Sequence, residues 1–335
     1  MGAVGAVGPV GAVGLLQQLS RRPGFTSCVT VGLLIVLMAV GGVAYPGFLS
    51  VQVVCNLLID NAYLVVIAIG MTFVILSGGI DLSVGSVLAL STIIAAWLLQ
   101  VAHWPPLLVI ICVLLLGAAF GGAMGALIHY FTLQPFIVTL GGMFLARGLC
   151  YLISIDAITI DDPLFVAMSR TQLPIAGGFV SPGVAIALFM LALAAWGAHY
   201  SAFGRAVYAI GGNEQSARMM GLAVGRTKVL VYAFSGVCAA LGGVLFAFYM
   251  LSGYALHAQG AELDAIAAVV IGGTLLAGGY GYVAGALSGV LVLGAIQTLI
   301  AFDGTLSSWW TKIVIGALLL AFCLVQRLLA TNKKN

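Results

Sequence analysis

The sequence predicts an all-α polytopic membrane protein with about ten transmembrane helices, some of them discontinuous, and both termini in the cytoplasm. Of its 335 residues, 63% are hydrophobic and 6% are charged, and the mean hydropathy is +1.22. A soluble domain carries about 25% charged residues, so this chain lacks the polar side chains to cover a globule in water. Its apolar runs, such as residues 107–116, are continuous, whereas a membrane β-barrel needs alternation.

Apolar stretches near the roughly 20 residues that cross a bilayer place the spans. They are residues 27–45, 54–77, 83–101, 107–129, 136–154, 181–199, 229–251, 264–278, 283–302 and 311–329. Residues 1–25 form a low-complexity tail of Gly, Ala and Val, without the basic start and cleavage site of a signal peptide. We therefore expect one transmembrane domain over residues 26–330, with cytoplasmic tails at residues 1–25 and 331–335.

Charged residues sort to opposite ends of these spans. Most basic residues fall on one side: Arg21, Arg22, Arg205, Arg218, Arg226, Lys228, Arg327, Lys333 and Lys334. Most acidic residues fall on the other side: Asp60, Asp156, Asp161, Asp162, Glu262, Asp264 and Asp303. Because basic residues collect on the cytoplasmic side, both termini and the long loop at residues 200–228 are predicted to be cytoplasmic.

Glycine-rich stretches interrupt two apolar segments, at residues 77–85 and 272–281. Glycine is costly inside a helix, and paired interruptions are typical of discontinuous helices that line a path. Two tight loops between ordinary spans are the alternative, in which Asp81 caps a helix that begins at Leu82. Glycines at four-residue spacing predict close helix packing. They are Gly117, Gly121 and Gly125 in one span, and Gly281, Gly285 and Gly289 in another.

Sequence signatures of catalysis are missing. The chain has no GxxxxGK[ST] phosphate loop, no HExxH and no GxSxG, and its histidines and cysteines are scattered singly. We expect no catalytic residues, no metal site, no cofactor and no nucleic-acid partner. Energy for uphill transport would then come from an ion gradient or from another subunit.

The cytoplasmic loop at residues 200–228 contains a short predicted helix. Asn213 is a good N-cap, Glu214 and Arg218 suit the two ends of the helix dipole, and Gly221 is a natural stop. So short a helix is marginal alone, and it needs a surface to dock on. Ala217, Met219 and Met220 supply an apolar face, which favours an external partner over the chain's own helix ends. The flanking Arg205, Arg226 and Lys228 are expected to set topology and contact lipid headgroups.

Several stretches together resemble the permeases of ATP-binding-cassette importers for ribose, xylose and arabinose. They are GMTFVILSGGIDLSVGS (70–86), PFIVTL (135–140), residues 146–148, YAIGGNEQSARMMG (208–221) and ELDAIAAVVIGG (262–273). The stretch FDGTLSSWWTKI (302–313) is more particularly similar to permeases of galactofuranose importers.

This resemblance implies an inner-membrane complex. Its partners would be an ATPase subunit, a homologous sister permease in a heterodimer, a periplasmic sugar-binding protein, the sugar and membrane lipid. The loop helix over Asn213–Gly221 would transmit ATP hydrolysis. The alternative, an ion-gradient-driven secondary sugar transporter, needs buried acidic residues, but Asp60, Asp81 and Asp264 are each expected at a helix end. An intramembrane enzyme would need a nucleophile–base pair, which the sequence lacks.

Sugar sites use hydroxyl and amide groups together with aromatic faces, and many residues of the spans qualify. They include Asn56, Asn61, Tyr63, Thr72, Thr139, Gln297 and Trp309. As candidate path residues we take Asn61, Tyr63, Thr72, Asp81, Arg147, Asp264 and Trp309. Arg147 is predicted near mid-membrane, where a charge needs a partner: Asp60, Asp264 or exposed carbonyls. Both a place on the path and a structural ion pair remain open for it.

Overall fold

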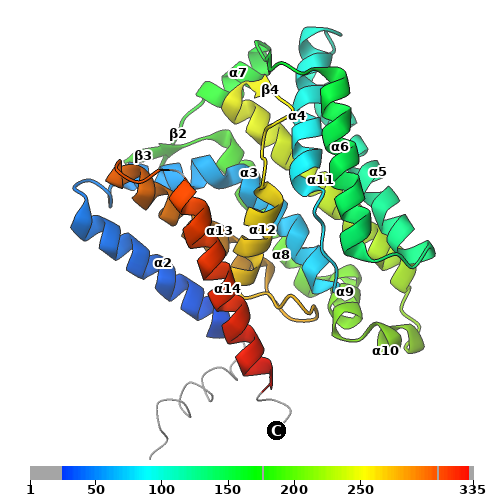
Figure 1. Ribbon diagram of the computed structural model, residues 1–335. Helices are drawn as coiled ribbons and strands as arrows, with labels where there is room; N and C mark the ends of the chain where they lie inside the picture. Colours follow the sequence, from blue (N-terminus) through cyan, green and yellow to red (C-terminus); the bar gives the residue numbers. More distant parts are fainter. Residues whose placement is uncertain (1–24, 176, 308, 332–335) are drawn as a thin grey trace, which may run out of the picture.

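The computed structural model describes the backbone of residues 25–175, 177–307 and 309–331 (Figure 1). Thirteen helices are defined in these ranges: α2 (Phe25–Ala44), α3 (Val51–Leu76), α4 (Val84–Gln100), α5 (Pro106–Tyr130), α6 (Pro135–Ile153), α7 (Pro163–Arg170), α8 (Pro182–Tyr200), α9 (Ala202–Gly212), α10 (Glu214–Met219), α11 (Val224–Met250), α12 (Ala261–Ile271), α13 (Val283–Asp303) and α14 (Trp309–Thr331). Two short antiparallel pairs join β1 (Ile158–Thr159) to β4 (Ser252–Gly253) and β2 (Leu173–Ile175) to β3 (Gly178–Val180). The predicted terminal tails lie almost wholly outside the described residues.

Each predicted span contains one helix. Within the described residues, six helices are long and apolar enough to cross a membrane: α3, α5, α6, α8, α11 and α13. Apolar stretches of α2, α4 and α14 are shorter. With 11 residues, α12 reaches roughly 16 Å, about half of the hydrocarbon core. The continuous span predicted at 264–278 is therefore wrong in extent, because the helix ends at Ile271. The count of ten crossings stays a prediction.

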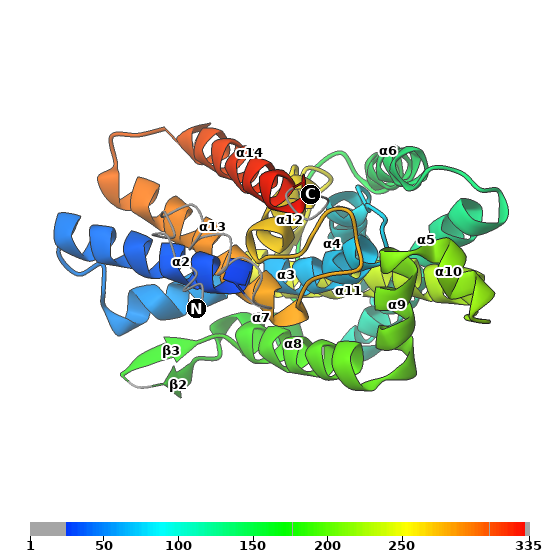
Figure 2. The same cartoon turned by 90° about the horizontal axis from the view of Figure 1, so that it is seen from below.

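α3 and α11 form the centre of the bundle. Every residue of α3 from Leu64 to Leu76 is buried, so this part of the helix is apolar and covered on all sides. α11 packs between α3, α4 and α5, while α13 and α8 cover other sides of α3. Seen from below, α6 and α14 lie on the same side of this centre with α4 and α12 between them (Figure 2).

The predicted glycine seams hold α5 to α11 and α12 to α13. A Cβ added to Gly121 would lie 2.1 Å from the carbonyl oxygen of Tyr232, and one added to Gly289 would lie 1.8 Å from that of Ala268. Such backbone contact leaves no room for a side chain, as expected of small-residue packing in membranes. The prediction was wrong for Gly281, which precedes α13 and lies in a loop.

The chain between α3 and α4 is a buried non-helical segment. Gly79, Asp81, Leu82 and Ser83 are buried. The carbonyl of Ile80 accepts hydrogen bonds from Thr139 Oγ1 at 3.3 Å and Tyr232 Oη at 3.4 Å. Tyr232 lies eight residues into α11, about 12 Å along the helix axis. This depth supports the discontinuous-helix alternative over an exposed tight loop.

A second non-helical segment, residues 251–260, runs from α11 to α12, within the connection expected between the spans at 229–251 and 264–278. A Cβ added to Gly253 would lie 2.4 Å from the carbonyl oxygen of Thr92, so the backbone of this segment presses directly on α4. The interruption predicted at residues 272–281 lies within the non-helical residues 272–282, which follow α12. α12 is consequently a short helix with non-helical chain at both ends.

The two ends of the bundle match the charge pattern of the sequence. Figure 1 shows α9, α10 and the C-terminal end of α14 at one end, and α7 and β4 at the opposite end. The predicted cytoplasmic loop thus shares an end of the bundle with the C-terminal end of α14. Which end faces the cytoplasm remains a prediction from the placement of basic residues.

Cysteine labelling checks this orientation. In a variant without the six native cysteines, Gln215→Cys in α10 should react with a membrane-impermeant thiol reagent only after permeabilisation. Asp156→Cys, before β1, should react in intact cells. Both positions are exposed, so access to the side chain does not limit the reaction. Labelling of position 215 from outside would reverse the assigned orientation.

Candidate functional site

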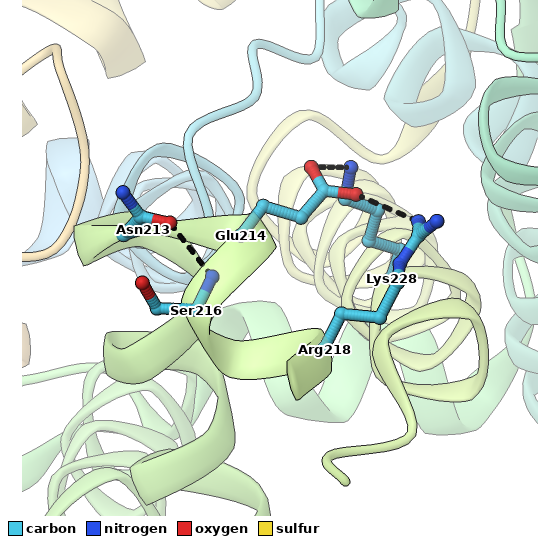
Figure 3. A network of polar contacts seen from close by, with 5 residues as sticks. All are labelled: Asn213, Glu214, Ser216, Arg218 and Lys228. Carbon is cyan, nitrogen blue, oxygen red and sulfur yellow. Dashed lines mark hydrogen bonds and ion pairs between the residues drawn. The ribbon is translucent and has the colours of Figure 1, made fainter. Parts of the chain in front are cut away.

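The predicted cytoplasmic helix exists as α10, and its two caps form as the sequence indicates. Asn213 Oδ1 accepts the backbone N–H of Ser216 at 2.8 Å (Figure 3). At the other end the N–H of Gly221 donates to Arg218 O at 3.0 Å and the N–H of Leu222 to Ala217 O at 3.1 Å. This pair of bonds, with Gly221 at φ +80°, is a Schellman cap, which stops the helix after two turns.

Ala217 does not belong to the exposed face predicted for α10. It is fully buried and packs with Ile210 of α9 and Val224 of α11. The prediction was wrong because the preceding residues form a helix, α9, against which α10 folds back. Met219 and Met220 are 75% and 69% exposed and form the apolar tip.

Ion pairs hold α10 to the start of α11. Glu214 lies 2.6 Å from Lys228 Nζ and 3.4 Å from Arg218 (Figure 3). The Lys228 side chain is only 18% exposed, so it is tied to α10 instead of reaching lipid headgroups as predicted. Exposed pairs contribute about 0.2–1 kcal/mol each, and here they mainly fix the orientation of the helix.

Arg147 has backbone carbonyls as partners. It lies about 18 Å along α6 from the start of that helix. Its guanidinium donates to the carbonyl of Ala255 and, at 3.0 Å, to that of His257, both in the non-helical segment 251–260. Of the partners predicted for Arg147, the structure therefore shows exposed backbone carbonyls. These two hydrogen bonds join α6 to residues 251–260.

Asp264, in the first turn of α12, pairs with Lys312 of α14 at 2.7 Å. Trp309, at the start of α14, is 75% exposed. Arg147, Asp264 and Lys312 thus belong to α6, α12 and α14, the helices that share one side of the bundle (Figure 2). A charged group that lies at membrane depth is costly unless protein or water lies against it.

A polar cavity of about 280 Å³ lies between α3 and α13. Polar side chains at its wall are Asn56, Asp60, Asn61, Gln297 and Thr298. Gly294 makes room for Asn61, because a Cβ there would lie 2.6 Å from the Asn61 amide nitrogen. Gln297 and Ala301 also line a second cavity of about 460 Å³ that reaches Thr311 and Lys312. Gln297 and Ala301 are thus common to the walls of both cavities.

Tyr63 faces a different cavity, of about 350 Å³, between α3, α8 and α11, which Gln172 and Tyr249 also line. Thr72 is buried and bonds to the carbonyl of Ala68 in its own helix. The candidate path residues therefore do not gather at one place. Only Asn61 lies with other predicted sugar-type side chains, namely Asn56 and Gln297.

Two acidic residues differ from their predicted places. Asp60 is the tenth residue of α3, not a helix end, and accepts from Tyr249 Oη at 3.1 Å. Asp81 precedes α4, which begins at Val84 instead of Leu82. Its carboxylate accepts from Ser83 Oγ at 2.6 Å and from Ser235 Oγ of α11 at 2.8 Å. Asp81 thus fixes the buried segment before α4 to α11.

Comparison with known proteins gives the following matches. Residues 53–323 match a family described as "Branched-chain amino acid transport system / permease component". The chain is 48% identical to the inner membrane ABC transporter permease protein YjfF of Escherichia coli (strain K12), over 92% of this chain and 93% of that protein. It is 40% identical to the fructose import permease protein FruG of Bifidobacterium longum, over 89% of each chain. It is 36% identical to the ribose import permease protein RbsC of Escherichia coli (strain K12), over 90% and 92%. No solved structure matches significantly.

Proposed function

This chain belongs to the permease family of ATP-binding-cassette importers, and within that family we propose that it carries galactofuranose through the cavities beside Gln297. It is a multi-pass inner-membrane permease of the ribose, xylose and fructose type, a transport component without its own ATPase site. The family implies an ATPase and a periplasmic binding protein as partners.

One observation carries the proposed path. Three side chains singled out as sugar-type, Asn56, Asn61 and Gln297, converge on the cavity between α3 and α13. Their amides can donate and accept, which suits the hydroxyl groups of a neutral sugar. From Gln297 the second cavity continues to Lys312, whose partner Asp264 lies on α12. The path would then pass along the side that α6, α12 and α14 share.

The choice of galactofuranose is supported by the resemblance of residues 302–313. Phe302 from this stretch lines the first cavity, and Gly304, Leu306, Thr311 and Lys312 line the second. The stretch that carries this resemblance therefore contributes to the wall of the proposed path. Relatives named for fructose and ribose support a neutral sugar as the class of cargo.

We also propose that the second permease is a homologous sister chain. The charged groups on α6, α12 and α14 require a covering surface that is not lipid, and a second permease would provide it. In this arrangement α10 is the coupling contact with the ATPase, through its exposed methionines.

Uptake into proteoliposomes tests this function. The complex of this chain, the sister permease and the ATPase should take up labelled galactofuranose only with ATP and the sugar-loaded binding protein. Collapse of ion gradients with ionophores should leave uptake unchanged. Uptake that needs a gradient instead of ATP would support a secondary transporter, and preferred uptake of ribose or fructose would replace the proposed cargo.

Gln297→Leu should lower uptake at least about tenfold, because a site built to hydrogen-bond a substrate loses that much or more without one partner. ATPase co-purification should not change. Gln172→Leu is the matched control, since it removes the same group from the cavity that Tyr63 lines. If Gln172→Leu abolishes uptake and Gln297→Leu does not, the path runs between α3, α8 and α11.

A further inference from the structure

Five glycines from three separate segments meet at the C-terminal end of α9. We call Gly78, Gly211, Gly212, Gly278 and Gly279 the glycine junction. A Cβ on Gly211 would lie 1.7 Å from the carbonyl oxygen of Leu76, at the end of α3, and 2.6 Å from the nitrogen of Gly279. A Cβ on Gly278 would lie 2.9 Å from Gly78 Cα, and one on Gly279 would lie 2.7 Å from Gly212 Cα. Three backbones are therefore in direct contact with no side chain between them.

Two hydrogen bonds join these segments. The N–H of Gly279 donates to the carbonyl of Leu76 at 2.9 Å, a group that the end of α3 leaves without an intrahelical partner. Tyr208 of α9 donates its hydroxyl to the carbonyl of Gly281 at 2.7 Å. Burial raises the pKa of the Tyr208 phenol, so the hydroxyl keeps its proton and remains a donor. Both bonds end on residues 272–282.

The junction lies one residue from α10. Gly212 is the last residue of α9, and Asn213, which follows it, caps α10. Aromatic contacts hold the opposite end of α9, where Phe203 stacks on Phe73 of α3 at 6.0 Å. Only Asn213 separates α10 from the glycine junction, so a displacement of α10 also displaces Gly212.

We propose that the glycine junction transmits movement of α10 to both interrupted segments, residues 77–83 and 272–282. This inference rests on the proposed coupling role of α10. Residues 77–83 lead into α4, and residues 272–282 lead into α13, which carries Gln297. Contacts between backbones cannot be relieved by a change of rotamer, so a shift of α9 displaces the other two chains. The ATPase thereby acts on α4 and on the path helix α13 through the glycine junction.

Gly211→Ala tests the glycine junction, because the added methyl group would separate its three backbones. We expect the ATPase to co-purify as in the wild type, while sugar uptake per ATP hydrolysed falls at least tenfold. Gly197→Ala in α8, outside the glycine junction, is the matched control, since its Cβ would meet nothing within 4 Å, and its ratio should stay within about twofold of the wild type. A normal ratio in Gly211→Ala would overturn the proposal.

Tyr208→Phe keeps the test open if Gly211→Ala does not assemble. Loss of one hydrogen bond should lower uptake per ATP about twofold to tenfold. Tyr200→Phe, at a residue 73% exposed, is the control and should have no effect. An unchanged ratio in Tyr208→Phe would count against the glycine junction in the same way.

Failure of the glycine junction is distinguishable from failure of the α10 contact. Substitution of Met219 and Met220 should remove the ATPase from the complex, whereas the junction variants should retain it. If the methionine variant loses the ATPase but Gly211→Ala and Tyr208→Phe couple normally, only the glycine junction is refuted. If the methionine variant keeps the ATPase and full uptake, the coupling role of α10 is refuted. The proposal for the glycine junction then fails with it, because the junction would have no movement of α10 to transmit.

Discussion

Replacing both Met219 and Met220 with Glu should detach the ATPase subunit from the complex. These side chains are 75% and 69% exposed at the tip of a helix whose other contacts are satisfied. Burial of a methionine contributes about 1.5–3 kcal/mol, so two carboxylates in their place should weaken association about a hundredfold or more. Co-purification of the ATPase with the tagged permease, followed by ATP hydrolysis with and without loaded binding protein, measures the effect.

Arg218→Ala is the control for this experiment. Arg218 is on the same helix, its side chain is 65% exposed, and its pair with Glu214 is an i,i+4 contact at 3.4 Å. Such pairs contribute about 0.3–0.5 kcal/mol, so association should change less than about threefold. Ala217→Glu is unsuitable because a buried carboxylate would disrupt the packing of α10 on α9 and α11. Wild-type association and transport by the double methionine variant would assign the contact to another segment.

Arg147→Ala should lower both the thermal stability and the yield of the complex, and transport with them. The guanidinium donates to two carbonyls of the non-helical segment 251–260. Hydrogen bonds to a charged group contribute about 1.5–3 kcal/mol each, and their loss leaves these carbonyls without that donor. The midpoint of thermal unfolding in detergent and the expression level measure this effect. Together they separate a structural role from a place on the path.

Two further variants sharpen this test. Arg147→Lys keeps the charge but loses the planar fork, so it should recover only part of the stability. Arg205→Ala removes an exposed arginine that donates to the carbonyl of Tyr200 at 3.2 Å, and it should have little effect. Normal stability with lost transport in Arg147→Ala would place this residue on the sugar path. Normal stability with normal transport would deny it either role.

The local structure of α10 could be predicted because its signals are local. An N-cap, a charge at each end and a C′ glycine act within two helical turns, and both caps form as expected. The exposure of Ala217 could not be predicted in the same way. It depends on α9, which forms from residues that were predicted to be a loop, and on where α10 lies against α11.

The same limit applies to the candidate path. Sequence alone identifies Asn61, Tyr63 and Gln297 as groups able to bind a sugar, but it cannot say which of them face one cavity. Neighbouring positions on α3 point different ways: Asn61 towards α13 and Tyr63 towards α8 and α11. Arg147 needed a partner at its depth, and only the course of residues 251–260 supplied one.

The sequence by itself determined that this protein is a membrane permease and where its long apolar helices lie. Hydropathy, charge placement and sequence motifs are properties of short segments, so they can be recognised without knowledge of the tertiary contacts. Only the tertiary structure decided how the interrupted segments are used. Gly211 and the pair Gly278 and Gly279 are far apart in sequence, yet a Cβ on any of them would collide with the backbone of another segment. Such a contact is a property of three segments together, and no one of them encodes it alone.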